Sequence, residues 1–452
     1  NGWDNYFNSI CSYCCTTPDP ETTGSITNAP QLTASAGNYR LQNGSPCIDA
    51  AAASSLEDDL AGFPRPLDGN GDGIASPDMG AYEYSRTHYV SSSGGHVWPY
   101  LAWADAAHDI QSAVDAADDT DVILVTNGIY NTGGRAVYGK MTNRVAVDKA
   151  ILVRSVSGPA LTRIEGHGPI GEQAVRSVYV GSNACLYGFA ISNGYTRSDG
   201  DDDREQSGGG VWCENSGVVS NCVLAGNTAV YAGGGAAFGV RGICLLEKNY
   251  AYVFAGGVYG AQLENCVVTK NVAGGDVGGA FQCTSVNSII YFNAALVTTN
   301  HLLCTIDYSC TTPDPGGTGN VTDDPLFADW TSGDYHFLTN SPCIDAGTAT
   351  DVAVDFDGYP RPLDGNAAGG EQWDMGMYEF ASGQVDADND GLSDARELEE
   401  VGTHPKTSDT DADGQSDGDE VVADVDPLDQ DSFFAVNQVS SSGGMPFVFS
   451  WH

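Results

Sequence analysis

Positive charge is scarce in this chain, which has 18 Lys plus Arg against 60 Asp plus Glu and a formal net charge of -42 over 452 residues. Such an acidic surface disfavours nucleic acids and anionic lipid surfaces as partners, because both carry charge of the same sign. The sequence also lacks a run of about 18 apolar residues, so it predicts no transmembrane helix. It lacks a signal peptide at Asn1, and since Asn1 falls inside a repeated module, we expect any export signal to lie upstream. The excess of carboxylates indicates a chain that binds cations.

A long internal repeat is the most informative feature that the sequence does contain. Residues 45–84 recur as residues 341–380, and both copies begin SPCIDA and contain PRPLDGN. Four pairs of residues are separated by one common interval: Cys47 and Cys343, Arg65 and Arg361, Asp68 and Asp364, Glu83 and Glu379. Repetition on this scale is typical of tandem modules. We therefore expect residues 1–85 to be the C-terminal part of a first module and residues 87–381 to be a complete second one.

A shorter repeat of 22 residues runs through the second module. Short apolar runs, Gly-Gly pairs and one asparagine recur in each unit, and the asparagines are Asn227, Asn249, Asn271 and Asn293. Equivalent strands of such units can stack at about 4.8 Å, which places the asparagines above one another at one corner. A β-sandwich is the alternative, but its turn signals fall about every 8–12 residues without a fixed long period. The sequence therefore predicts an all-β fold, a right-handed parallel β-helix over residues 121–300.

Three cysteines occupy equivalent places in successive units, at Cys222, Cys244 and Cys266. They lack the C-x-x-C spacing of a zinc site, so we expect an inward ladder of small apolar groups. At the start of the module, Trp103, Ala107, Ile110, Val114 and Ala117 recur at helical spacing just before the apolar run of residues 122–125. This pattern predicts an amphipathic helix that covers the open end of the β-helix.

The strongest chemical signal is a pair of calcium loops within residues 385–431. Oxygen-bearing residues stand at positions 1, 3, 5, 9 and 12 of each loop, glycine stands at position 6, and a backbone carbonyl is expected at position 7. The alternative is a solvated acidic linker, which would not place glycine at position 6 twice. The predicted Ca²⁺ ligands are Asp386, Asp388, Asp390, Leu392, Asp394 and Glu397 in the first loop, and Asp409, Asp411, Asp413, Gln415, Asp417 and Glu420 in the second.

A weaker metal candidate lies in the first long repeat, where the residues spaced like the start of a calcium loop are Asp68, Asn70, Asp72 and Asp78. The alternative is a polar turn of Gly, Asn and Asp. Two further pairs are predicted as disulfides, Cys15–Cys47 and Cys310–Cys343, because each Cys-Thr-Thr-Pro precedes an SPC cysteine at nearly the same separation. Buried thiols are the alternative for these four cysteines.

Signals for catalysis are weak in this sequence. Gly166-His167-Gly168 superficially resembles a polygalacturonase motif, but the acidic residues that accompany it in that family are not found in order. Asp201, Asp202 and Asp203 could include an acid and a base for glycoside chemistry, yet they stand in a Gly/Asp/Ser segment typical of a solvated loop. We therefore expect a chain that is not an enzyme and that does not turn over acidic glycans, which its negative charge should repel.

The order of these motifs resembles bacterial β-helix surface proteins whose modules end in a choice-of-anchor Q region. The resemblance is carried by the Trp103 helix, the glycine-rich coils, Cys310-Thr-Thr-Pro and the repeated segment of residues 341–380. Residues 385–431 resemble thrombospondin type 3 and dockerin-like calcium repeats rather than calmodulin-type sensors. The resemblance implies an exported protein of the bacterial cell surface, with calcium in a structural role.

The expected function is that of an extracellular structural protein, such as an adhesin, a fibre or a surface-layer component. Its expected partners are other copies or modules of the same protein, with surface glycans as a further class. Residues 433–452 alternate apolar and polar residues and are expected to begin another β domain. The alternative is a β-helix protein that binds or degrades polysaccharide. A groove with exposed aromatic residues and two convergent carboxylates would favour that alternative.

Overall fold

The structure is a computed structural model of the whole chain. It describes residues 12–17, 22–32, 39–42, 44–53, 59–60, 65–66, 69, 74–423 and 425–432, and the backbone of residues 436–440 and 448–451.

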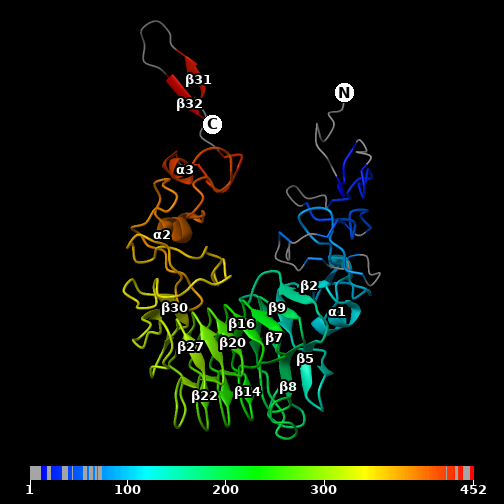
Figure 1. The fold of residues 1–452 in the computed structure, drawn as a ribbon, viewed down its shortest axis with the longest axis vertical. Coiled ribbons are helices and arrows are strands. Elements are labelled where there is room, and N and C mark those ends of the chain that lie inside the picture. The colour runs from blue at the N-terminus through cyan, green and yellow to red at the C-terminus, as the bar shows by residue number, and fades with distance from the viewer. Residues whose placement is uncertain are drawn as a thin grey trace.

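Residues 87–311 form a parallel β-helix whose coils contribute to three long sheets (Figure 1). The nine-stranded sheet contains, in spatial order, β1 (Thr87–Val90), β2 (Val122–Val125), β6 (Leu152–Ser155), β9 (Cys185–Tyr187), β12 (Val218–Ser220), β16 (Val240–Gly242), β20 (Gln262–Glu264), β24 (Thr284–Val286) and β27 (Thr305–Asp307). Every pairing within this sheet is parallel. The predicted fold class is confirmed.

The second long sheet, here called the β3–β28 sheet, contains β3 (Gly128–Tyr130), β7 (Thr162–Glu165), β10 (Ala190–Ser192), β13 (Val223–Ala225), β17 (Leu245–Glu247), β21 (Val267–Thr269), β25 (Ile289–Tyr291) and β28 (Cys310–Thr311). The third, the β4–β26 sheet, contains β4 (Arg135–Ala136), β5 (Thr142–Val147), β8 (Val175–Val180), β11 (Val211–Cys213), β15 (Ala236–Ala237), β19 (Val258–Tyr259), β23 (Ala280–Phe281) and β26 (His301–Leu302). A short sheet of β14 (Thr228–Ala229), β18 (Tyr250–Ala251) and β22 (Val272–Ala273) lies at the corner between them.

The predicted asparagine ladder is present at one corner of the coils. The Asn227 amide nitrogen Nδ2 and the Asn227 backbone N–H both donate to Asn249 Oδ1 at 3.0 Å, and Asn249 bonds to Asn271 in the same way. Asn271 continues the ladder to Asn293. Because each side chain also donates to a backbone carbonyl of its neighbouring coil, a buried polar corner is satisfied at every level.

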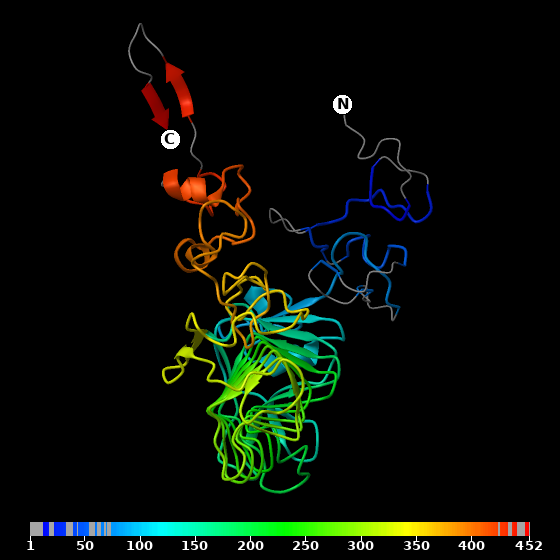
Figure 2. The same cartoon turned by 60° about the vertical axis from the view of Figure 1, so that its left-hand side comes forward.

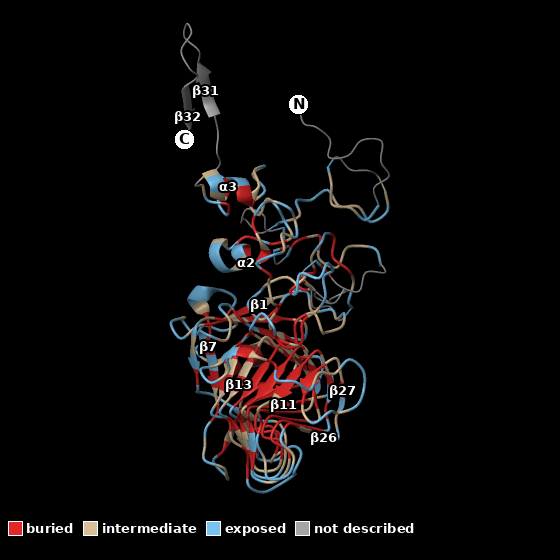
Figure 3. Cartoon of the chain, turned by 90° about the vertical axis from the view of Figure 1, so that its left-hand side faces the viewer, coloured by how far each residue is buried: buried red, intermediate tan, exposed pale blue. Residues whose placement is uncertain are grey.

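The Gly-Gly pairs follow this corner because no side chain would fit there. A Cβ atom on Gly235 would stand 2.8 Å from Asn249 Nδ2, and one on Gly234 would stand 2.3 Å from the carbonyl oxygen of Tyr250. The interior of the coils is apolar, and Cys222, Cys244 and Cys266 are fully buried within it (Figure 3). The repeat of 22 residues therefore fixes both the corner and the core.

The helix at the start of the module is shorter than the sequence pattern predicts. Residues Trp103–Asp105 form one 3₁₀ turn, η1, and Ala107 makes a parallel bridge to Val90 instead of continuing the helix. The helix proper, α1, covers Ile110–Ala116 and begins where the Asp109 carboxylate accepts from the Ser112 N–H at 2.8 Å. Its apolar face packs on β1, β2 and β5, so it covers the end of the β-helix as expected.

The end of the second module, residues 326–380, packs on the outward face of the β3–β28 sheet. An apolar cluster joins that face to the module end through Leu245, Val267, Ile289, Tyr335 and Met377. The module end contains the antiparallel hairpin of β29 (Phe327–Asp329) and β30 (Asp334–Phe337). A second hairpin, β31 (Val436–Ser440) with β32 (Val448–Trp451), is described for its backbone only, so most of the predicted further β domain lies outside the described residues.

The described residues of the first module and the segment of residues 385–432 rise from the same side of the β-helix, near its two ends (Figures 1 and 2). That segment contains α2 (Asp394–Arg396), the π-helical turn η2 (Glu397–Val401) and α3 (Asp417–Ala423). None of the described helices has the length and apolar character needed to cross a bilayer.

Candidate metal centres and candidate glycan groove

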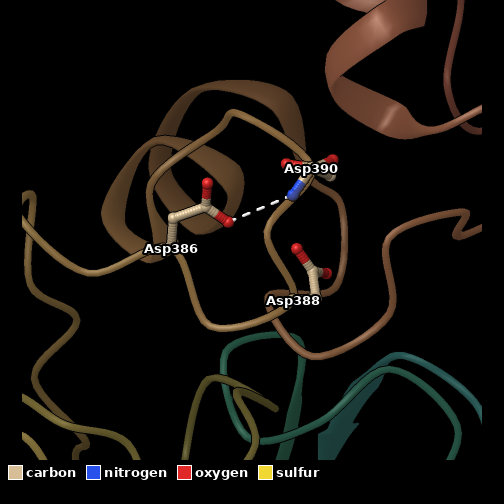
Figure 4. A group of neighbouring side chains, drawn as sticks. All are labelled: Asp386, Asp388 and Asp390. Carbon is tan, nitrogen blue, oxygen red and sulfur yellow. Dashed lines mark hydrogen bonds between the residues drawn. The ribbon is translucent and has the colours of Figure 1, made fainter.

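The first predicted calcium loop folds back so that its early carboxylates converge. Oxygens of Asp386, Asp388 and Asp390 all lie within 4.8 Å of one another (Figure 4). Asp386 Oδ1 and Oδ2 accept from the N–H groups of Asp390 at 3.2 Å and Gly391 at 3.1 Å. Gly391 has a φ of 100°, a left-handed conformation that explains why glycine stands at position 6.

The second loop reproduces this geometry 23 residues later. Oxygens of Asp409, Asp411 and Asp413 again lie within 4.8 Å of one another. Asp409 Oδ2 accepts from the Gly414 N–H at 2.9 Å, and Gly414 has a φ of 102°. At position 7, the Gln415 N–H donates to Asp413 Oδ1 at 2.8 Å, as the Leu392 N–H does to Asp390 Oδ1 in the first loop.

Carboxylate oxygens in both loops lack a hydrogen-bond partner within the described protein although they are shielded from water. The residues that carry them are Asp388, Asp394 and Glu397 in the first loop and Asp409, Asp411, Asp413 and Glu420 in the second. Asp394, Glu397 and Glu420 are themselves fully buried, at 0% exposure. An unpaired buried charge is costly, and a bound cation removes that cost.

The raised pKa values of the position-12 residues, Glu397 and Glu420, reflect the same cost of unpaired buried charge. Burial, reinforced by Asp388, Asp390 and Asp394, raises the pKa of Glu397 to about 8. Burial, reinforced by Asp413 and Asp411, raises the pKa of Glu420 to about 7. A hard divalent cation bound by oxygen ligands would reverse both shifts, and the donor set of carboxylates with no cysteine or histidine fits Ca²⁺.

The weaker metal candidate of the first repeat is only partly described. Asp68, Asn70 and Asp72 lie outside the described residues. Asp78 is buried, and its Oδ1 accepts from the Asp49 N–H at 2.7 Å. In the second copy, Asp364 accepts from the backbone of residues 368–370, as the polar-turn alternative requires.

Cys15, Cys47, Cys310 and Cys343 are free thiols in this structure, and the two disulfides stay predictions. The predicted partners are nevertheless neighbours. Burial and a hydrogen bond with Cys310 raise the pKa of Cys343 well above its ordinary value, and burial and a hydrogen bond with Cys15 raise the pKa of Cys47 to about 11. The two cysteines of each predicted pair therefore lie close together.

A surface groove of about 550 Å³ lies where the β3–β28 and β4–β26 sheets meet. Its polar lining includes Arg144 from β5, Glu165 from the end of β7, His167, and Tyr195, which follows β10. Arg144 Nε donates to the Glu165 carbonyl oxygen at 2.9 Å, so the guanidinium braces the groove wall. The His167 backbone pairs with Val175 in both directions, at 2.9 and 2.8 Å, and the exposed His167 is part of the groove lining.

The sequence singled out His167 and its two glycines but not the rest of this groove. Gly168 packs under the Tyr195 ring, and a Cβ at residue 168 would stand 2.7 Å from that ring. The glycines thus have a packing role. Arg144, Glu165 and Tyr195 carried no signal in the sequence, because they belong to different coils and only the fold gathers them.

The acidic segment considered for catalysis does not form a site. Asp201 Oδ1 accepts from the Arg204 N–H at 2.8 Å, Asp202 Oδ1 from Gln206 Nε2 at 2.7 Å, and Asp203 Oδ1 from the Tyr259 hydroxyl at 3.1 Å. The three exposed carboxylates therefore serve separate contacts and do not converge on a common point.

Neither a family model nor a curated protein matches this sequence. Among solved structures, the pectate lyase Pel9A is similar at 13% identity and a TM-score of 0.36, over 66% of this chain and 96% of that one. The pectin methylesterase PemA from Erwinia chrysanthemi is similar at 12% identity and a TM-score of 0.28, over 54% of this chain and 68% of that one. A pectin methylesterase in complex with a hexasaccharide is similar at 11% identity and a TM-score of 0.25, over 49% and 80%.

The likeness to these structures is one of fold, the right-handed parallel β-helix. It contradicts the expectation that the chain is not an enzyme, since all three are pectin enzymes. That expectation was drawn from missing motifs, which exclude particular families and not the chemistry that a β-helix can carry. The resemblances to choice-of-anchor Q modules and to thrombospondin type 3 repeats remain predictions.

Proposed function

We propose that this chain is an extracellular calcium-binding β-helix protein that binds polysaccharide in the His167 groove. The calcium part rests on one observation, the set of buried carboxylate oxygens without partners in two loops of identical spacing. Each loop binds one Ca²⁺, and the ions hold residues 385–431 folded. Without them, two clusters of carboxylates repel one another within a short segment.

Calorimetry and limited proteolysis of the full chain test the calcium part. The parent protein should bind two Ca²⁺ ions, and chelator should expose residues 385–431 to cleavage while the β-helix stays intact. Asp388→Ala should remove the first site and Asp411→Ala the second. Asp419→Ala is the matched control, because Asp419 is exposed and belongs to neither carboxylate cluster. Equal proteolysis with and without chelator would contradict a structural role for the ions.

The glycan part is favoured by the chemistry gathered in the groove. Glu165 and His167 both line the groove, and Glu165 Oε1 lies 3.6 Å from Arg163 Nη1. A carboxylate and an imidazole so placed can act as acid and base on a bound sugar. Tyr195 offers an aromatic surface, and the volume of about 550 Å³ falls in the usual range of ligand sites. These residues support a glycan-binding, glycan-cleaving role over a purely structural surface role.

Incubation with a panel of neutral and acidic polysaccharides tests this part, with reducing ends and unsaturated products as readouts. For the polysaccharide that is cleaved, Glu165→Gln should lower the rate by roughly 10²–10⁴-fold. His167→Ala should also lower it. Glu172→Gln is the matched control, because Glu172 is an exposed carboxylate that is not part of the groove lining. Full activity in Glu165→Gln, or neither binding nor cleavage of any polysaccharide, would refute the assignment.

A further inference from the structure

The two calcium loops are in direct contact through Asp390 and Gly418. Asp390 Oδ2 accepts from the Gly418 N–H at 2.8 Å, although the two residues are 28 positions apart. A Cβ atom on Gly418 would stand 2.1 Å from the Asp390 carbonyl oxygen, so only glycine permits this approach. The equivalent position of the first loop, 23 residues earlier, is Ala395, which has no such restriction. The sequence therefore differs between the loops at the point where they meet.

This contact brings a carboxylate of the second loop to the first. Oxygens of Asp390, Glu397 and Asp417 lie within 4.8 Å of one another, and Glu397 and Asp417 are both fully buried. Glu397 Oε1 accepts a long hydrogen bond of 3.4 Å from the Thr403 hydroxyl, whereas Glu397 Oε2 has no partner within the described residues. A cation between three buried or half-buried carboxylates at this separation would remove the cost of their mutual repulsion.

We propose that Asp417, which the loop spacing assigns to the second ion, also binds the ion of the first loop together with Asp390 and Glu397. The inference rests on the calcium part of the proposed function. It makes the two loops one unit, in which a side chain of the second loop completes the first site.

The position-9 residues of the two loops explain why this arrangement is asymmetric. Asp417 Oδ1 accepts from the Thr410 N–H at 2.9 Å and Oδ2 from the Thr410 hydroxyl at 2.7 Å. Asp394 Oδ1 accepts from the Ala387 N–H at 2.9 Å, but alanine has no hydroxyl, so Asp394 Oδ2 is left without a partner. Thr410 thus holds the Asp417 carboxylate rigidly, and each of its oxygens keeps a second lone pair for a cation.

The decisive experiment measures each site in isolation by calorimetry on the full chain. In the Asp411→Ala background only the first site remains, and adding Asp417→Asn should weaken its Ca²⁺ affinity about 10–100-fold. The matched control adds Asp419→Asn, which should change nothing. In the Asp388→Ala background only the second site remains, so the same Asp417→Asn change there measures how much Asp417 contributes to the Ca²⁺ affinity of the second site. A first site that keeps its affinity in Asp411→Ala with Asp417→Asn overturns the inference, whatever happens at the second.

Gly418→Ala in the Asp411→Ala background provides an independent test, since it displaces the second loop without removing a ligand. It too should weaken the first site. Unchanged affinity in this variant would also count against the inference. If the parent chain binds no Ca²⁺, the calcium part of the proposed function fails. If the parent binds two ions, but neither Asp417→Asn nor Gly418→Ala weakens the first site in the Asp411→Ala background, only the proposed role of Asp417 at the first site fails.

Discussion

At the scale of single residues, each of the two long repeats contains the same buried ion pair. Arg361 Nε lies 2.7 Å from Glu379 Oε2, and Arg65 Nε lies 2.8 Å from Glu83 Oε1 in the first copy. Arg361 Nη2 also donates to the carbonyl oxygens of Gly376 and Tyr378, whereas the buried Arg361 Nη1 has no partner within the described residues. Removing one partner of such a pair costs about 3–5 kcal/mol, which explains why both members recur.

A second single side chain, His336, should make the stability of the protein depend on pH. Hydrogen bonds with Asp357 at 2.9 Å and Asp334 at 2.7 Å raise the pKa of His336 to about 9. Because the folded-state pKa lies above the unfolded value near 6.5, the stabilisation is complete below pH 6.5 and is lost as pH rises through 9. The side chain is half-exposed, so we expect no more than about 1 kcal/mol.

The measurement compares the parent with His336→Gln by thermal unfolding at several pH values. The parent should exceed the variant in stability at pH 6, and the difference should vanish above pH 9. Titration of the His336 ring protons by NMR gives the pKa directly, and a value near 6.5 would contradict the prediction.

At the scale of elements, the asparagine ladder predicts that replacing one of its middle residues lowers the stability of the β-helix. In Asn249→Leu, the Asn227 N–H and the Leu224 carbonyl oxygen lose their partner inside a buried corner. We expect a loss of about 1–3 kcal/mol in the free energy of unfolding, measured by urea denaturation. Asn215→Leu is the control, because Asn215 is exposed in a turn. Equal stability of the two variants would show that the ladder contributes nothing.

The same ladder shows why the fold could be predicted and the groove could not. Asn227, Asn249 and Asn271 repeat one contact at one spacing, so the sequence displays the geometry of a coil directly. The groove depends on Arg144, Glu165 and Tyr195, which come from coils of unequal length and stand at no common interval. The length of α1 was overestimated because Ala107 fits a helical period and yet is needed for a bridge to Val90.

At the scale of the whole molecule, the two flanking segments do not continue the axis of the coils. Figures 1 and 2 show the described first-module residues and the calcium segment on the same side of the β-helix. A straight rod of coaxial modules, which the stacking of coils suggests, does not follow from this arrangement. The direction of the chain after the β-helix is set by how the calcium segment contacts the module end.

Hydrogen bonds from Tyr359 and Lys406 contribute to that contact. The Tyr359 hydroxyl donates to the Leu398 carbonyl oxygen at 3.2 Å, and Lys406 Nζ donates to the Pro362 carbonyl oxygen at 2.6 Å and to Glu371 Oε2 at 2.9 Å. Leu398 lies directly after Glu397 and Lys406 lies between the two loops, so we expect both contacts to depend on bound Ca²⁺.

Chelation should therefore release this segment from the module end as well as unfold it. Small-angle X-ray scattering of the full chain should show a larger radius of gyration and maximum dimension after Ca²⁺ is removed, with recovery when it is restored. The Asp388→Ala plus Asp411→Ala variant should scatter like the chelated parent in the presence of Ca²⁺, because its loops no longer hold Leu398 and Lys406 in place. Superimposable profiles with and without Ca²⁺ would mean that the contacts of Tyr359 and Lys406 persist without the ions, and the calcium segment would then have no part in fixing the direction of the chain.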